Sequence, residues 1–273
     1  ALLREFRMQL AMIQDKIIPY KDLQATYLDR GTFFGDGVYE VIRSYNGRIF
    51  ELDKHLQRFA RSLREINIES VEIEDIKARV EETFTRANIP DAKIYFHITR
   101  GSAERNHGLA EQLIPNFFLT VTELPDNTAK KQKGIKVSTY PDLRWKRCDI
   151  KSLNLLPNVM ARIDAEKKGC QEAILIDENG YITEGSASAF FMILADKKQL
   201  ITRQLGKEIL PSITRGILEQ IAPKAGLTVT EHKMTPKQAK NADELLIAVT
   251  TQDSTGIVEF DGVKIGDGTP GPY

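Results

Sequence analysis

Lys151, in the segment RWKRCDIKSLNLLPN, is the first residue whose surroundings suggest chemistry. It lies between an expected extended segment and an expected helix, and leucines follow it closely. A lysine amine that is partly removed from water can act as a nucleophile toward an aldehyde. A lysine whose charged end stays in water at the surface is the commoner case, so this context alone leaves both interpretations open.

Glu184 lies in YITEGSASAFF, where an expected strand meets a Gly- and Ser-rich turn. A carboxylate at this position is either an exposed charge at a strand end or the partner of a ring nitrogen. In the second case it would keep the ring protonated, which lets a pyridinium ring accept electrons. Ser186 and Ser188 would then offer hydroxyl groups nearby.

The segment LPSITR predicts the start of a helix that Ser212 can cap. The backbone N–H groups of Ile213 and Thr214 would point outward there, and phosphate binds well at such a helix end. Thr250 and Thr251, which end the expected strand ELLIAVTT, could add hydroxyl groups. Threonine is also common in strands, so the pair alone does not establish a site.

Arg105 and His107, in TRGSAERNHGL, form a cationic pair in an expected loop. Arginine suits a two-point grip on a carboxylate, and histidine can add a hydrogen bond. A solvated polar loop is the alternative. The other histidines have no metal-ligand spacing, so no metal site is expected.

The elements that must position these residues alternate between strands and helices in the first half of the chain. GVYEVIRSYNGRIFEL predicts a hairpin with its turn at Asn46-Gly47. Helices are expected over 53–68, with Asp53 as the N-cap, and over 74–88. KIYFHITRG and NFFLTVTEL are expected strands, and the polar stretch 124–134 is the expected linker between two domains, 1–123 and 135–273.

The second half repeats this mixed pattern. IKVSTYP predicts a strand, and PNVMARIDAEKKG predicts a helix with Pro157 near its start and Gly169 at its end. EAILIDENGYITEGSASAFFMIL predicts a hairpin that turns at Asn179-Gly180, and SITRGILEQI predicts a further helix. Interleaved strands and helices in two halves indicate an α/β (or α+β) fold.

Composition narrows the class of protein. The chain has 273 residues, and its 38 basic residues balance its 38 acidic ones. A neutral balance argues against a nucleic-acid or membrane-surface partner, since both require a concentrated basic face. We expect a cytoplasmic protein, because the N-terminal stretch has no clear secretion signal and the two cysteines, Cys148 and Cys170, are isolated.

Taken together and in this order, the motifs resemble the branched-chain and D-amino acid transaminase family, the pyridoxal-phosphate (PLP) enzymes of fold type IV. The stretches that carry the resemblance are RGTFFGDGVYEVIRSYNG, KHLQRF, RWKRCDIKSLNLLPNVMARIDAEKKGCQEAILID, ITEGSASAFF and ILPSITR. The resemblance implies two α/β domains with PLP at their interface. It also implies a homodimer in which a loop of the other subunit completes each site.

The resemblance assigns the cofactor contacts. It makes Lys151 the lysine of the Schiff base and Glu184 the partner of the pyridine nitrogen. Arg58, in KHLQRF, resembles the arginine that binds the cofactor phosphate, and Leu210 resembles the apolar residue that packs on the ring face away from the lysine. The remaining expected cofactor contacts are the amides of Ile213 and Thr214 and the hydroxyls of Thr250 and Ser188.

Substrate contacts follow from a closer resemblance to the D-amino acid members of the family. Tyr39 in GDGVYEV, with Arg105 and His107 in ERNH, matches the group that binds the substrate α-carboxylate, and Thr251 is a further expected contact. The expected reaction is ping-pong transamination between a D-amino acid and a 2-oxo acid, either 2-oxoglutarate or pyruvate.

Other members of the family leave alternatives open. An L-branched-chain transaminase and an aminodeoxychorismate lyase share the scaffold, and a protein that only binds PLP is a third possibility. Relatives continue with another helix after a motif like GDGTPGP, so a C-terminal helix is expected to be missing here.

Overall fold

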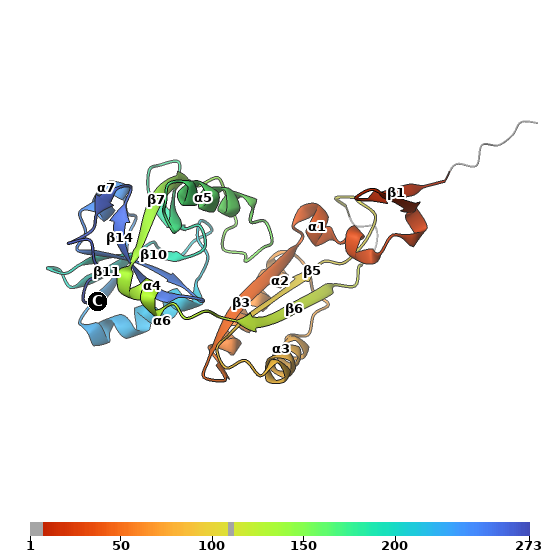
Figure 1. The fold of residues 1–273 in the computed structure, drawn as a ribbon, viewed down its shortest axis with the longest axis horizontal. Coiled ribbons are helices and arrows are strands. Elements are labelled where there is room, and N and C mark those ends of the chain that lie inside the picture. Colours follow the sequence, from red (N-terminus) through yellow and green to blue (C-terminus); the bar gives the residue numbers. More distant parts are fainter. Residues whose placement is uncertain (1–7, 109–111) are drawn as a thin grey trace, which may run out of the picture.

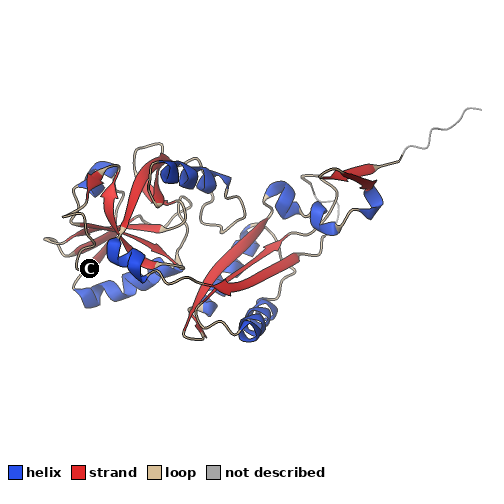
Figure 2. Ribbon diagram, viewed as in Figure 1, coloured by secondary structure: helices blue, strands red, loops and turns tan. Residues whose placement is uncertain are grey.

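The computed structural model describes residues 8–108 and 112–273. The N-terminal stretch considered for a secretion signal therefore begins outside the described residues. Within them, every helix is too short or too polar to cross a membrane. Two halves, residues 8–123 and 135–273, lie side by side and are joined by the segment 124–134 (Figures 1 and 2).

The N-terminal half is built on an antiparallel sheet in the order β4-β3-β5-β6. The predicted hairpin is confirmed: β3 and β4 meet at Asn46 and Gly47, whose φ angles of 48° and 79° suit the tight turn that such a pair favours. The elements of this half are β1 (Leu10–Ile13), β2 (Lys16–Pro19), η1 (Tyr20–Asp22), η2 (Ala25–Leu28), α1 (Arg30–Phe34), β3 (Gly37–Tyr45), β4 (Arg48–Ile49), α2 (Leu52–Glu65), α3 (Ile73–Ala87), β5 (Ala92–Thr99) and β6 (Asn116–Glu123).

Helices α2 and α3 cover one face of this sheet (Figure 1). Val38 and Ile42 of β3 point to the helices and are fully buried, because alternate residues of a strand share a face. Both predicted helices are confirmed, but the predicted cap of α2 is wrong. Glu51 occupies the N-cap position in a left-handed conformation, and Asp53 lies inside the first turn, where its carboxylate binds Lys77 instead.

The segment between the halves contains a helix. α4 (Thr128–Lys133) occupies most of the expected linker 124–134 and packs beside β14. The polar composition predicted a linker there without a helix of its own. The structure shows a short helix instead, and its C-terminal end carries three lysines that favour the negative end of the helix dipole.

The C-terminal half is built on a nine-stranded mixed sheet, in the order β12-β11-β10-β13-β14-β7-β8-β9 with β15 beside β14. Its elements are β7 (Ile135–Pro141), α5 (Leu156–Lys167), β8 (Glu172–Ile176), β9 (Ile182–Gly185), β10 (Ala189–Leu194), β11 (Gln199–Thr202), α6 (Ile213–Ile221), η3 (Ala222–Ala225), β12 (Thr228–Glu231), α7 (Pro236–Lys240), β13 (Glu244–Val249), β14 (Asp253–Phe260) and β15 (Val263–Lys264).

The core of this half lies among the central strands. β10 and β13 are buried along almost their whole length, as the continuous apolar runs AFFMIL and LLIAV require. Phe190 and Phe260 meet edge to face in this core, with ring centres 6.3 Å apart. The α/β class predicted from the sequence is therefore confirmed.

Candidate active site between the two halves

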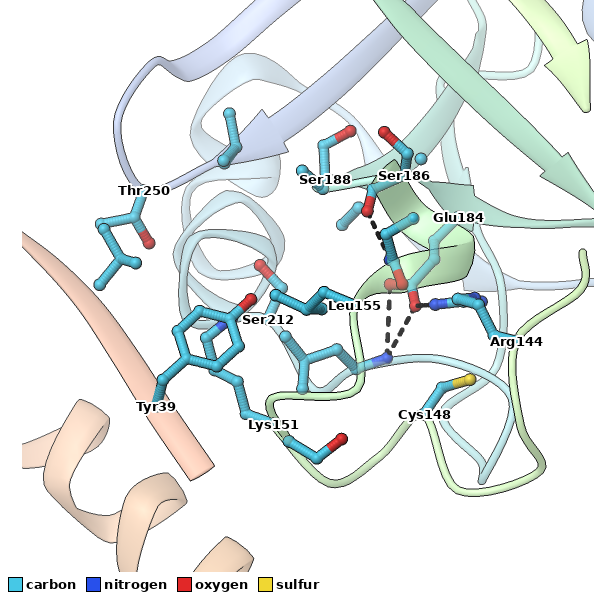
Figure 3. Close-up of a pocket in the computed structure, with 18 of the residues that line it drawn as sticks. Tyr39, Arg144, Cys148, Lys151, Leu155, Glu184, Ser186, Ser188, Ser212 and Thr250 are labelled. Carbon is cyan, nitrogen blue, oxygen red and sulfur yellow. Dashed lines mark hydrogen bonds and ion pairs between the residues drawn. The ribbon is translucent and has the colours of Figure 1, made fainter. Parts of the chain in front are cut away.

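A cavity of about 530 Å³ lies between the halves, and most of the residues singled out in the sequence line it (Figure 3). β3 and α2 border it on one side, and the turn between β9 and β10 and the end of β13 border it on the other. The predicted residues that it brings together are Tyr39, Arg58, Lys151, Glu184, Ser188, Leu210, Thr250 and Thr251.

Lys151 belongs to the C-terminal half of the chain but is held against the N-terminal sheet. The amide of Tyr39 donates a hydrogen bond to the Lys151 carbonyl at 3.0 Å, and the Leu153 amide donates one to the Gly37 carbonyl at 3.0 Å. The chain around Lys151 thereby extends the ladder of β3. The Lys151 amine lies 4.3 Å from the centre of the Tyr39 ring, inside the cavity.

Ion pairs fix the loop that leads into Lys151. Arg61 of α2 donates to the carbonyl of Asp149 at 2.8 Å and also to its carboxylate, and Arg147 donates to the same carboxylate at 2.9 Å. Burial raises the pKa of Asp149, but the hydrogen bonds from Arg147 and Arg61 outweigh it, so the pKa lies below its ordinary value. Asp149 therefore remains a charged anchor two residues before the lysine.

Glu184 is buried at the cavity wall, at the end of β9. Its carboxylate accepts hydrogen bonds from the Arg144 guanidinium and, at 3.2 Å, from the Leu210 amide. Burial raises the pKa of Glu184, and the charge of Arg144 opposes that rise without cancelling it. A cationic N–H group bound in the cavity would favour the ionised form of Glu184 and would donate a hydrogen bond to it.

Arg58 is held rigidly by a second buried carboxylate. Its guanidinium donates two hydrogen bonds to Glu40, at 2.8 and 2.7 Å, and His55 donates to the same carboxylate at 2.7 Å. Glu40 is fully buried on β3. Burial alone would raise its pKa, but the charge and hydrogen bonds of Arg58 lower it to about 2. This pairing fixes the guanidinium at the cavity wall.

The cavity end beside Arg58 is suited to an anion. Arg58 donates to the Pro211 carbonyl at 3.0 Å, and the next residue, Ser212, caps α6 by accepting a hydrogen bond from the Arg215 amide at 3.2 Å. Ser212 lines the cavity, so the N-terminal end of α6 faces it. The first amides of α6 belong to Ile213 and Thr214, as the sequence predicted, but their side chains do not border the cavity.

Ser186 and Ser188 line the cavity, but both hydroxyls donate to a carboxylate behind them. Ser188 Oγ lies 2.9 Å from Glu172, and Ser186 Oγ also donates to Glu172, which is itself buried in β8. Glu172 thereby fixes the turn between β9 and β10. Because both serine hydroxyls donate their protons to Glu172, they can act toward a ligand only as hydrogen-bond acceptors.

The structure does not bring Arg105 and His107 to this cavity. Their loop packs against α1, where the Arg30 guanidinium donates to the His107 carbonyl at 3.1 Å. The Phe34 ring lies 5.1 Å from the His107 ring and 5.3 Å from the Arg105 guanidinium. Within one chain, the expected trio with Tyr39 is therefore incomplete.

Three further residues of the site, Glu40, Arg144 and Glu172, were not singled out from the sequence. The first carried a detectable signal, because period-two alternation places Glu40 on the apolar face of β3, between Val38 and Ile42. A carboxylate at a core position predicts a buried cationic partner. Arg144 and Glu172 carried no comparable signal, since their partners come from other parts of the chain.

The arrangement combines an amine, a buried carboxylate and an anion-binding end around one cavity. It suits a ligand with an anionic group at one end and a basic ring nitrogen at the other. The described residues include no cluster of three or more histidine, cysteine, aspartate or glutamate side chains suited to a metal ion.

Comparison with known proteins agrees with this arrangement. Residues 37–260 match the family described as amino-transferase class IV. The chain is 39% identical over 245 residues to a D-alanine aminotransferase of Bacillus licheniformis, covering 89% of this chain and 86% of that protein.

Solved structures share the fold. The branched-chain aminotransferase from the archaeon Thermoproteus uzoniensis, solved with norvaline, superposes with a TM-score of 0.81 at 23% identity, covering 97% of this chain and 91% of that one. A fold IV-transaminase from Curtobacterium pusillum gives 0.79 at 20% identity, covering 91% and 87%. Fold type IV, predicted from the sequence, is confirmed, and the chain belongs to the class IV aminotransferase family.

Proposed function

We propose that the chain uses pyridoxal 5′-phosphate to exchange an amino group between a D-amino acid and a 2-oxo acid. The observation that carries the proposal is that Lys151, Glu184 and Arg58 border one cavity, although they come from distant parts of the chain. The D-alanine aminotransferase that is 39% identical to the chain supports the D-amino acid as substrate.

The residues of the cavity fit this cofactor. Arg58 has five N–H groups, of which three are used in its bonds to Glu40 and Pro211, so donors remain for a phosphate. Ser212 at the N-terminal end of α6 and Thr250 line the same cavity, and a helix N-terminus suits a phosphate. Glu184 supplies an acceptor for the ring nitrogen, and Leu210 supplies an apolar side chain for the ring face.

When bound, the cofactor supplies an aldehyde that takes up the amine and a ring that accepts the electrons of the broken C–H bond. Lys151 would hold the cofactor covalently between turnovers. Once displaced by the substrate amine, its Nζ would remove the α-proton and return it to the neighbouring carbon of the cofactor. Glu184 would keep the ring nitrogen protonated throughout.

Stereochemistry would follow from the position of Lys151. Only a hydrogen that faces its amine can be removed, so the side on which the α-carboxylate is held selects the enantiomer. Tyr39 lies directly beside that amine. We assign the carboxylate to the Tyr39 side, which presents the α-hydrogen of a D-amino acid to Lys151.

We further propose that Arg105 and His107 complete the site of a second subunit in a homodimer. Both are carboxylate-binding residue types, yet within their own chain they lie away from the cavity. A two-fold dimer can bring this loop to the partner's cavity, because each subunit then contributes the same loop to the other.

The deciding experiment is a half-reaction. The protein is loaded with PLP, and its visible absorption is followed after D-alanine or L-leucine is added separately. We expect D-alanine to remove the absorption band of the bound cofactor and L-leucine to leave it in place. Lys151→Ala should abolish this response, whereas Lys146→Ala, which changes an exposed lysine of the same segment, should retain it.

The opposite preference would keep the lysine assignment and move the enzyme to L-amino acids. A response in Lys151→Ala equal to that of the unmodified protein would refute the role of Lys151. Tight PLP binding without any response to either amino acid would show a protein that binds the cofactor without transamination.

A further inference from the structure

Most cationic side chains on the cavity wall pair with a carboxylate or have a role in the proposed reaction. Those in the described part of the chain are Arg58, Lys93, Arg144, Lys151 and Arg162. The three arginines pair with carboxylates: Arg58 with Glu40, Arg144 with Glu184 and Arg162 with Glu166. Lys151 is assigned to the reaction. Lys93 remains, and no carboxylate of the described residues lies within 4.0 Å of its amine.

The position of Lys93 on the sheet places it beside a second cation. It lies directly opposite Arg43 in the antiparallel pairing of β3 with β5. Like charges at such positions destabilise a sheet. Arg43 is compensated, because Asp253 accepts a hydrogen bond from it at 3.1 Å and the Tyr45 ring lies 3.7 Å from its guanidinium. The Lys93 side chain is exposed, so water solvates its charge, and with no carboxylate of the described residues paired to it the amine remains available to an anionic ligand in the cavity.

The wall between the reaction centre and Lys93 is apolar. Tyr39 and Val41 of β3 line the cavity in that order, and Lys93 lies level with Arg43, the next residue on the same face. Four residues of strand from Tyr39 to Arg43 span about 13 Å. Lys93 also lines the cavity, and its four-carbon stem is long enough to cover part of this distance. Along this wall the Lys151 amine comes first, the apolar side chain of Val41 follows, and the cationic Lys93 comes last.

We propose that Lys93 determines substrate specificity by binding the distal carboxylate of a dicarboxylic substrate. The methylene groups of that substrate would pass Val41, and its far carboxylate would reach the Lys93 amine. This rests on the proposed function, since it assumes that the α-carbon of the substrate lies at Lys151. It selects 2-oxoglutarate over pyruvate as the amino acceptor.

The proposal is tested by the kinetic preference of the enzyme for 2-oxoglutarate over pyruvate. The ratio of kcat/KM for 2-oxoglutarate to kcat/KM for pyruvate is measured with one D-amino acid other than D-alanine as the donor, because D-alanine and pyruvate would only regenerate each other. Lys93→Met, which keeps the length and removes the charge, should lower the ratio about tenfold, the scale of a charge-assisted hydrogen bond. Lys93→Arg should preserve most of it. Lys197→Met, which removes an exposed charge in the turn between β10 and β11, should leave it unchanged.

A binding measurement separates this proposal from the proposed function. Glutarate and valerate share a five-carbon chain and differ by one carboxylate, and neither carries an amine. Calorimetric titration of the PLP-loaded protein should show tighter binding of glutarate, with a preference that Lys93→Met removes and Lys93→Arg retains. That result would support the carboxylate site even if no transamination were observed.

Equal binding of the two acids in the unmodified protein would overturn the proposal. So would a glutarate preference that survives Lys93→Met, or a kinetic ratio that falls equally in Lys93→Met and Lys197→Met. Circular dichroism of each variant establishes that it is folded, and a misfolded Lys93→Met is replaced by Lys93→Gln, for which the same outcomes hold.

Discussion

At the scale of single residues, the fully buried carboxylate of Glu40 needs an explanation. A fully buried carboxylate is unfavourable unless an ionic partner and hydrogen bonds satisfy it. Here Arg58 supplies the opposite charge, and Arg58 and His55 both donate hydrogen bonds. Burial lowers the pKa of His55, so the imidazole is neutral at neutral pH and Arg58 supplies the balancing charge. Arg58 is thereby prevented from rotating away from the cavity.

Glu40→Gln should destabilise the protein by about 3 kcal/mol at pH 7, because it leaves Arg58 buried without its counter-charge. The lowered pKa of Glu40, about 2, gives a stabilisation that is present above pH 4.5 and lost as the pH falls toward 2. The difference in the free energy of unfolding between the unmodified protein and Glu40→Gln should therefore shrink as the pH falls from 4.5 toward 2. Urea unfolding of both cofactor-free proteins at several pH values from 7 to 3 measures this difference in free energy.

Asp53→Asn is the matched control, since that carboxylate is 73% exposed and pairs with Lys77 at the surface. It should change stability by less than about 1 kcal/mol. If Glu40→Gln changed the free energy of unfolding by as little as this, or by an amount that did not vary with pH, the ionised Glu40 would not stabilise the fold through Arg58.

How well single residues could be predicted depended on how local their signal was. Lys151 and Glu184 lie within contiguous motifs, so both could be assigned to the site from the sequence alone. Glu172 binds serines that follow it by 14 and 16 positions, and Arg144 binds a carboxylate 40 positions away. Tertiary pairings of this kind leave no periodic pattern in the chain.

At the scale of elements, β3 contributes both to the cavity wall and to a joint between the halves. Near its end, Arg43 and the Tyr45 hydroxyl donate to Asp253, which also accepts a hydrogen bond from Lys131 of α4. Burial raises the pKa of Asp253, but the bonds from Lys131 and Tyr45 lower it by more, so this residue stays ionised. The turn that carries Thr250 is fixed by the same joint.

Asp253→Asn should therefore weaken PLP binding about tenfold, because the Thr250 hydroxyl would lose its fixed position relative to Arg58. Fluorescence titration of the cofactor-free protein with PLP gives the dissociation constant. Asp267→Asn, which changes an exposed carboxylate in the C-terminal loop, provides the control and should bind PLP normally. If Asp253→Asn lowered only the unfolding midpoint, the joint would stabilise the fold without positioning the cofactor.

Element boundaries were predicted well where both ends carried local signals. Ser212 caps α6 as expected, and Pro157 and Gly169 mark the ends of α5. The cap of α2 could not be predicted, because Glu51 adopts a left-handed conformation that ordinary residues disfavour. The order of strands in the larger sheet was also beyond sequence periodicity, since neighbours such as β14 and β7 come from distant parts of the chain.

At the scale of the whole molecule, the cavity depends on both halves and, in our proposal, on a second subunit. Lys151→Ala and Arg105→Ala each remove a different part of a shared site. Unfolding the two inactive or weakened variants together and refolding them should restore about a quarter of the wild-type sites. Half of the random dimers are then hybrids, and each hybrid has one intact site.

Activity of the refolded mixture, compared with each variant refolded alone, measures this restoration. A mixture no more active than the two variants refolded separately would place Arg105 outside the shared site. Size-exclusion chromatography at the assay concentration provides the accompanying measure of assembly.

The pairing of residues 151–153 with β3 has one more consequence, for aggregation. β3 pairs with β4 near its far end, so its Gly37–Tyr39 edge would otherwise expose unpaired backbone groups. Such an edge invites pairing with a strand of another molecule. The segment that carries Lys151 also covers this edge, so a change that loosens its Asp149 anchor should promote insoluble assembly as well as loss of activity.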